Sequence, residues 1–147
     1  MGYPLFLTLH LFAALVFIGT VFFEVLLLES IRKQLPAKVM VLLEQRIGQR
    51  ARQLMPWVLL VLFGAGAAMV WLRYWPVLSS PLQSSFGLLL GLKMLLAGSV
   101  LGHFLWAMWL FKSARMNTRY VRFIHTSVFL HLVAIVLLAK GMFYLTW

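Results

Sequence analysis

The chain has 147 residues, of which 63% are hydrophobic and only 11% are charged. Soluble domains have roughly 45–50% apolar and about 25% charged residues, so this composition excludes a soluble globular protein. It also excludes a disordered chain, which lacks apolar residues. The chain contains 13 Lys and Arg residues and only three acidic residues, which gives a formal net charge of +10. It contains no cysteine. The absence of cysteine excludes disulfides, thiolate metal sites and cysteine nucleophiles.

Four apolar stretches are each long enough to cross a bilayer as a helix, which takes about 20 residues. They cover approximately residues 4–28, 54–72, 86–111 and 120–144. Short connections favour antiparallel neighbours in a helical bundle. We therefore expect an all-α integral membrane protein, in which residues 1–147 form a single antiparallel, up-down bundle of four transmembrane helices.

A further stretch, from Ala37 to Gln53, precedes the second span and is also rich in apolar residues. Its apolar residues recur at helical spacing, at Val39, Leu42, Leu43 and Ile47. The pattern predicts either an interfacial amphipathic helix or an extension of the second span.

The basic residues are concentrated in two of the three loops. The first loop carries Arg32, Lys33, Lys38, Arg46, Arg50 and Arg52, and the third carries Lys112, Arg115, Arg119 and Arg122. Loops rich in Lys and Arg face the cytoplasm, so we expect a multi-pass protein of the bacterial inner membrane with both termini on the periplasmic side. Topology and anionic lipid explain the positive charge, and no nucleic-acid partner is expected.

The third span carries a stripe of glycines at positions 87, 91, 98 and 102. Four residues at this spacing share one helix face, and small residues let membrane helices approach closely. We expect this face to pack against another helix, either within the bundle or across a homodimer.

Ionisable groups inside a membrane span are costly and usually functional. The second span has none, and the other three contain seven: His10, Glu24, Lys93, His103, His125, His131 and Lys140. Counting about 1.5 Å per residue from the span ends divides them into two layers. Glu24 and three of the histidines fall in the cytoplasmic half, where His103 and His131 match best in depth. His10, Lys93 and Lys140 fall in the outer half.

This arrangement favours a haem b site. Two neutral imidazoles from different helices can ligate haem iron inside a four-helix bundle, so the candidate cofactor and metal ligands are His10, His103, His125 and His131. Arg122 lies at the basic end, where it suits a haem propionate. Glu24 is a candidate proton relay because it shares a helix face with His10, and Lys93 is a second candidate catalytic residue. The alternatives are histidines that make hydrogen-bonded helix contacts and lysines that extend to the interface.

Three segments resemble small four-helix bacterial membrane proteins: LTLHLFAALVFIG, LKMLLAGSVLGHF and RYVRFIHTSVFLH. They are similar to the CopD-like (copper resistance D domain) group and to its relative HemJ, a haem-binding protoporphyrinogen oxidase. The resemblance implies that His10, Lys93 and His103 match family features. In the fourth span, His125-Thr126 stands where HemJ-type proteins tend to have Asn-Glu, which favours a haem or metal protein of the CopD-like branch.

Two functions follow as expectations. The first is a haem b redox protein that passes electrons between a partner protein and a quinone, porphyrinogen or oxygen species, as an electron carrier or a membrane oxidoreductase. The second is a copper transport or copper-resistance protein with His and Met ligands, since soft ligands suit copper. The chain has eight methionines, but they are scattered over several spans.

Overall fold

This computed structural model describes residues 2–145, and within them the chain is built of helices and connecting turns. Four helical stretches are long and apolar enough to cross a membrane: Gly2–Ile31, Ala37–Leu78, Ser85–Lys112 and Thr118–Tyr144. The expected all-α fold with four membrane-spanning helices is therefore confirmed. The helices form two compact units, with the division after Tyr74, and each unit is described by itself.

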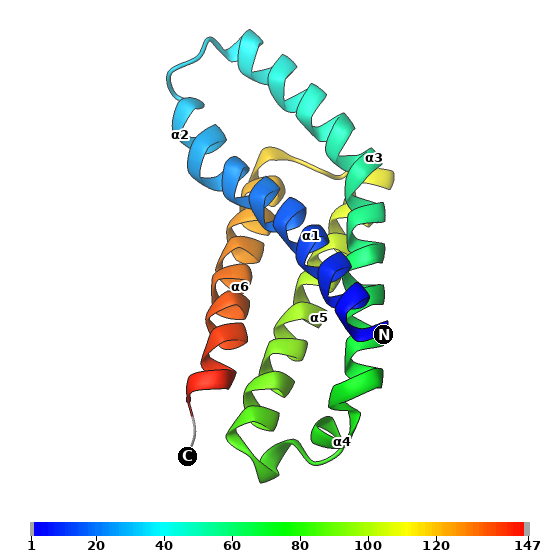
Figure 1. Ribbon diagram of the computed structural model, residues 1–147. Helices are drawn as coiled ribbons and strands as arrows, with labels where there is room; N and C mark the ends of the chain where they lie inside the picture. Colours follow the sequence, from blue (N-terminus) through cyan, green and yellow to red (C-terminus); the bar gives the residue numbers. More distant parts are fainter. Residues whose placement is uncertain (1, 146–147) are drawn as a thin grey trace. The chain divides into compact units, whose positions relative to one another are not determined.

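The first unit is an antiparallel helix pair (Figure 1). Its elements are α1 (Gly2–Phe22), the π-helical turn η1 (Phe23–Leu28), α2 (Glu29–Ile31), α3 (Ala37–Met69) and the π-helical turn η2 (Val70–Tyr74). At one end the hydroxyl groups of Tyr3 and Tyr74 lie 2.9 Å apart. At the other end Arg32 pairs with Glu44. These two contacts, together with buried side chains such as Phe17 and Leu59, hold α1 along α3.

The structure shows that α3 begins at Ala37, well before the expected second span. The stretch from Ala37 to Gln53 is thus the continuous amino-terminal part of α3. Pro56 lies inside the helix, where it removes one backbone hydrogen bond and favours a bend. Figure 1 shows α3 changing direction between its cyan and green parts.

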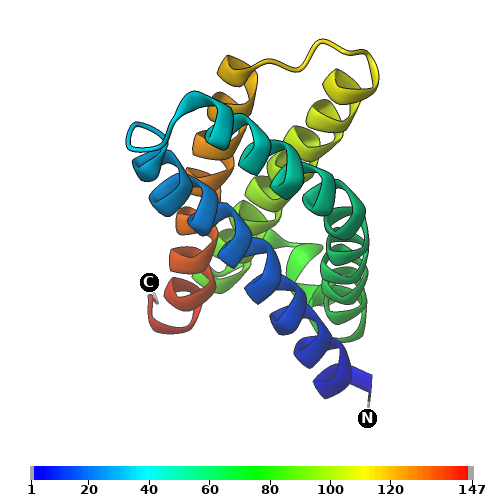
Figure 2. The same cartoon turned by 90° about the horizontal axis from the view of Figure 1, so that it is seen from above.

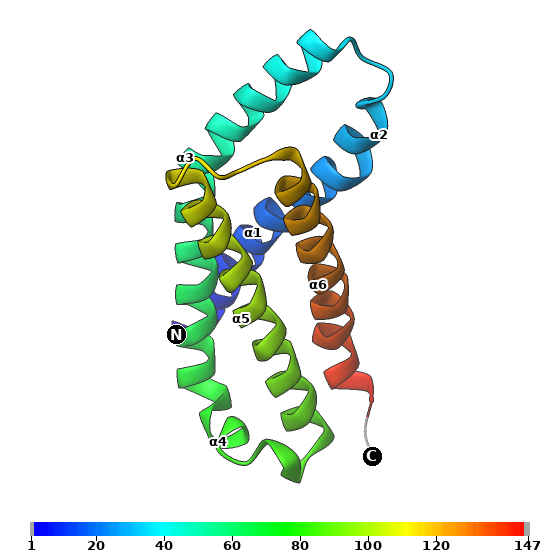
Figure 3. The same ribbon diagram turned by 180° about the vertical axis from the view of Figure 1, so that it is seen from behind.

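The second unit is another antiparallel pair. It consists of α4 (Trp75–Leu78), the short 3-10 helix η3 (Pro81–Gln83), α5 (Ser85–Lys112) and α6 (Thr118–Tyr144). The second span was expected to end near residue 72, but helical structure continues to Leu78. Side-chain caps start the two long helices, because Ser84 accepts from the Gly87 amide and Asn117 from the Tyr120 amide. Figure 2 shows the segment that joins α5 to α6, and Figure 3 shows the two helices side by side.

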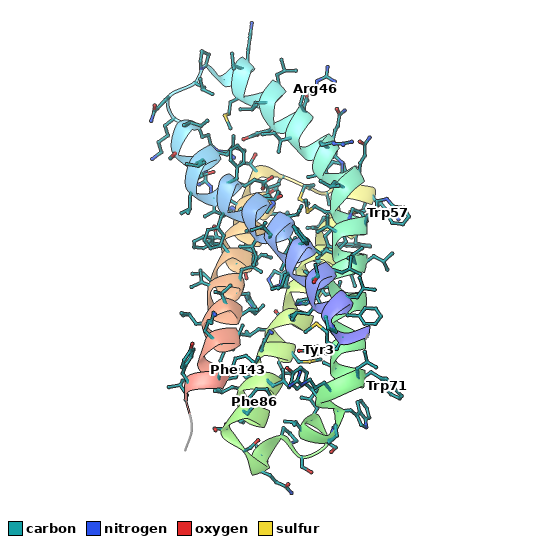
Figure 4. The ribbon with its side chains drawn as sticks, in the orientation of Figure 1. Tyr3, Arg46, Trp57, Trp71, Phe86 and Phe143 are labelled. Atoms are coloured by element: carbon teal, nitrogen blue, oxygen red, sulfur yellow. The ribbon has the colours of Figure 1, made fainter. Side chains whose placement is uncertain are left out.

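Aromatic side chains pack α5 against α6 at both ends of the pair. Phe86 at the start of α5 meets Phe143 near the end of α6, with ring centres 5.6 Å apart (Figure 4). At the opposite end Trp106 meets Tyr120 and Phe123 edge to face, at 5.8 and 6.2 Å. The antiparallel register that these contacts define brings the middles of the two helices together.

The glycine stripe of α5 does not act as one helix-packing face within this unit. A Cβ atom on Gly87 would lie 2.9 Å from the Pro81 carbonyl oxygen, so this glycine accommodates the turn that precedes α5. Gly91 also faces Pro81. Outside the adjoining backbone of α5 itself, no heavy atom of the described residues lies within 4 Å of a Cβ built on Gly98 or Gly102. At its first two positions, the glycine stripe therefore allows α5 to pack closely against the turn that precedes it.

Candidate functional site

The candidate residues fall at separate places along the helices. In the first unit, His10 lies on α1 and Glu24 lies in η1, about 21 Å further along the helix axis. In the second unit, His103 lies on α5 facing His131 on α6, with ring centres 5.3 Å apart. The structure thus confirms the depth match between these two histidines and brings them into contact.

His103 is held by its own helix through one nitrogen. Its Nδ1 atom donates to the backbone oxygen of Ser99, one turn earlier, at 2.8 Å. Helical side chains lean toward the amino terminus, which brings the ring to that carbonyl. A carbonyl can only accept, so Nδ1 carries the proton, and in a neutral imidazole Nε2 is then the acceptor.

His131 repeats this arrangement on α6. Its Nδ1 atom donates to the backbone oxygen of Ser127 at 2.7 Å. Two hydroxyls then cross between the helices, because Ser127 Oγ lies 3.0 Å from His103 Nε2 and Ser99 Oγ lies 3.0 Å from His131 Nε2. The four residues form a closed hydrogen-bonded ring, which we call the Ser–His ring: Ser99, His103, Ser127 and His131.

The Ser–His ring does not fit two axial ligands of one haem. Imidazoles on opposite sides of one metal ion have ring centres roughly 6 Å apart, since the metal–nitrogen bond is about 2 Å. The centres of His103 and His131 are closer, at 5.3 Å, and their planes are tilted by 57°. Both Nε2 atoms also face serine hydroxyls across the helix pair. This arrangement joins the two helices and leaves no place for a macrocycle between the two rings.

His10 bridges α1 and α3 in the first unit. Its Nδ1 atom donates to the backbone oxygen of Leu62 at 2.8 Å. Gly66 makes room for the ring, because a Cβ atom there would lie 3.2 Å from both Nδ1 and Cε1 of His10. With Nδ1 bonded to a carbonyl, Nε2 is the basic nitrogen of the neutral ring. This is the orientation in which proteins present histidine to a metal, so His10 fits the donor that haem iron requires.

Glu24 lies in a π-helical turn, where the backbone nitrogen of Glu29 reaches back five residues to the Glu24 oxygen. π-Helical turns inside α-helices are frequent at functional sites. The side chain is half-buried. Its distance along the helix shows that Glu24 and His10 do not form one cluster, although sequence spacing placed them on a common face.

The remaining candidates lie outside the Ser–His ring. Lys93 is half-buried on α5, about 15 Å along the helix from His103. His125 is half-buried on α6, nearer its start. Arg122 is exposed and, with Arg119 and neighbouring side chains, lines an open hollow of about 480 Å³ at the start of α6. Lys140 is exposed near the end of α6, as expected for a lysine that extends to an interface.

Sequence reasoning missed Ser99, Ser127 and Gly66. A signal for the serines was present, since Ser-x-x-x-His occurs twice, at 99–103 and at 127–131. Antiparallel helices that align two such motifs bring each serine opposite the other's histidine. Gly66 belongs to a run of small residues, and the run does not distinguish which of them faces His10.

Within residues 2–145, no group of three or more His, Cys, Asp or Glu side chains is placed to hold a metal ion. A scan against protein-family models and searches of curated proteins and of solved structures give no match to this chain.

Proposed function

We propose that this chain is a membrane redox protein that binds haem b through His10. The proposal rests on one observation above all, the hydrogen bond from His10 Nδ1 to the Leu62 carbonyl within an apolar helix pair. That bond selects the tautomer in which Nδ1 carries the proton and Nε2 is the basic nitrogen of the neutral ring. A histidine inside a membrane helix is costly, and ligation of a cofactor is a strong reason to retain it.

The surroundings of His10 support the same proposal. Gly66 leaves room for the imidazole beside α3, and both helices present mainly apolar side chains that suit a macrocycle. When bound, haem b supplies a one-electron iron couple. The protein's part is to hold the iron ligand, exclude water and set the polarity around it. The resemblance to CopD-like and HemJ-like proteins is part of this proposal, with a quinone, a porphyrinogen or a redox protein as the electron partner.

Further residues are assigned roles within the proposal. Glu24 transfers protons, because it is a half-buried carboxyl in a π-helical turn of the same helix as His10. Lys93 is the second candidate catalytic residue, as a half-buried amine within an apolar span. The orientation in the proposal follows the positive-inside rule, with the basic loops in the cytoplasm and both termini on the periplasmic side of a bacterial inner membrane.

The experiment is to purify the protein from cells supplied with haem and to record its absorption spectrum. We expect a Soret band and a reduced α-band, which His10→Ala abolishes. His131→Ala is the matched control, since it removes an intramembrane histidine from the other unit, and it should retain the bands. A colourless preparation, or one that contains stoichiometric copper instead, would contradict the proposal.

A second measurement addresses the proton-transfer role of Glu24. In the haem-loaded protein, Glu24→Gln should leave the spectrum intact and slow turnover with the electron acceptor. Glu29→Gln is the control, because Glu29 is already engaged by Arg32 outside the apolar part of the span. Unchanged turnover in the Glu24 variant would exclude it from proton transfer.

A further inference from the structure

The amino-terminal part of α3, residues Ala37–Gln53, extends beyond the thickness of a membrane. We call this segment the basic arm. The whole of α3 has 33 residues, a length of about 50 Å, whereas the hydrocarbon core is about 30 Å thick. Trp57 follows the arm and is 69% exposed. Tryptophan anchors helices at the membrane–water interface, so Trp57 indicates that the arm begins where the hydrocarbon ends.

The bend in α3 separates the arm from the part of the helix that spans the membrane. Pro56 stands between the arm and Trp57, and a proline inside a helix removes a hydrogen bond and kinks it. In Figure 1 the cyan part of α3 leans away from the direction of its green part. The arm is therefore tilted relative to the membrane span that follows it.

One face of the arm lies toward Arg32, the residue that follows α2. Met40 on this face is only 5% exposed. Arg32 pairs there with Glu44, and its Nε atom donates to Glu29 at 2.9 Å. A single arginine thus engages two of the three acidic residues of the chain.

The opposite face of the arm combines basic and apolar side chains. Four residues of this face follow one another at four-residue steps along the chain: Lys38, Leu42, Arg46 and Arg50. Each step rotates the position by only about 40° around the helix axis, so the four form one stripe. All four are exposed, as is Val39 beside them. Among residues 2–145, the three basic members make no ion pair. Figure 4 shows Arg46 projecting away from the arm.

We propose that this outer face binds the headgroups of anionic phospholipids at the membrane surface. Lys38, Arg46 and Arg50 contact the phosphates, and Val39 and Leu42 enter the boundary between headgroups and acyl chains. Exposed apolar residues beside basic ones are the chemistry of interfacial helices, whose basic side chains keep their charged ends at the headgroups. The unmatched positive charge selects anionic over zwitterionic lipid. The inference is independent of haem and would survive the failure of the proposed function.

The test uses the natural absence of cysteine. Single-cysteine variants Val39→Cys and Leu42→Cys are spin-labelled, and the full chain is placed in nanodiscs of phosphatidylcholine alone or with phosphatidylglycerol. Accessibility to oxygen and to an aqueous nickel complex reports the depth of each label. With phosphatidylglycerol we expect both labels at the headgroup–acyl boundary. The combined K38Q/R46Q/R50Q variant should move both labels into water and weaken phosphatidylglycerol retention about tenfold or more, measured by native mass spectrometry.

The matched control is K112Q/R115Q/R119Q, which removes the same charge from the loop between α5 and α6. It should leave the labels of the arm in place. Labels that are equally exposed to water in both lipids would overturn the proposal, as would labels that the K38Q/R46Q/R50Q substitutions do not move. Labels shielded from both oxygen and nickel would also overturn it, because a protein partner would then cover the face.

Discussion

The Nε2 atom of His103 lies 3.0 Å from the Oγ atom of Ser127 on the facing helix. The equivalent contact in the opposite direction, between Ser99 Oγ on α5 and His131 Nε2 on α6, has the same length. Each serine also offers its backbone oxygen to the histidine of its own helix, so neither ring can rotate without breaking bonds on both helices. The Ser–His ring is therefore a hydrogen-bonded polar contact that joins α5 and α6 in the middle of an otherwise apolar helix pair.

The first prediction concerns the tautomers of these histidines. Because backbone carbonyls accept from Nδ1 in both rings, both should carry the proton on Nδ1 when neutral. Nitrogen chemical shifts from solid-state NMR in lipid distinguish this form from the Nε2–H form. The signals of each histidine are assigned by their disappearance from the spectrum of the corresponding variant, His103→Gln or His131→Gln. Observation of Nε2–H rings at either position would contradict the hydrogen-bonded ring.

The second prediction is that Ser127→Ala and Ser99→Ala destabilise the protein by similar amounts, about 1 kcal/mol each. Each substitution removes one of the two equivalent bonds between the helices. Ser79→Ala is the control and should have little effect, because its hydroxyl donates to the Pro76 carbonyl within its own turn. Unfolding in detergent, followed by circular dichroism, measures these changes. Clearly unequal losses for the two serines would argue against a symmetric ring.

Much of the fold could be predicted from the sequence because hydrophobicity alone selects membrane helices. The third and fourth spans, expected near 86–111 and 120–144, differ from α5 and α6 by at most two residues at each end. The second span was expected to start at residue 54, and α3 begins 17 residues earlier. The stretch from Ala37 to Gln53 combines basic and apolar residues, a pattern that fits an interfacial helix as well as an extension of the span. The extension of α3 was therefore one of two expectations between which composition could not decide.

The candidate site could be predicted only in part. Depth counting paired His103 with His131, since rise per residue is fixed in a helix. It could not reveal that Nδ1 of each ring is held by a carbonyl one turn away, because that depends on side-chain rotamers. For the same reason spacing alone did not identify the Leu62 carbonyl as the partner of His10.

The third prediction tests the position of His10. Gly66→Ala adds a methyl group 3.2 Å from the imidazole, so the ring must shift away from the Leu62 carbonyl. We expect haem content to fall about tenfold, in line with the loss of an orienting partner around a metal ligand. Gly64→Ala is a close control, because no described atom lies within 4 Å of its Cβ position. Equal haem content in the two variants would show that Gly66 does not position the ligand.

The fourth prediction concerns the end of α5. Ala114 has a φ of 54°, in the left-handed region that L-residues adopt at a cost of about 1–2 kcal/mol. It occupies the position usually taken by glycine in a helix-ending motif, since the Arg115 nitrogen donates to the Leu110 oxygen and the Ala114 nitrogen to the Phe111 oxygen.

Ala114→Gly should therefore stabilise the protein by up to about 1 kcal/mol, after subtraction of the extra entropy that glycine gives the unfolded chain. Thermal unfolding in detergent would show this as a higher midpoint temperature. Ala107→Gly, inside α5 and five residues before its end, makes the same chemical change at a right-handed helical position and should destabilise by about 1 kcal/mol. Effects of the same sign in both variants would mean that the left-handed conformation at Ala114 is not the source of strain.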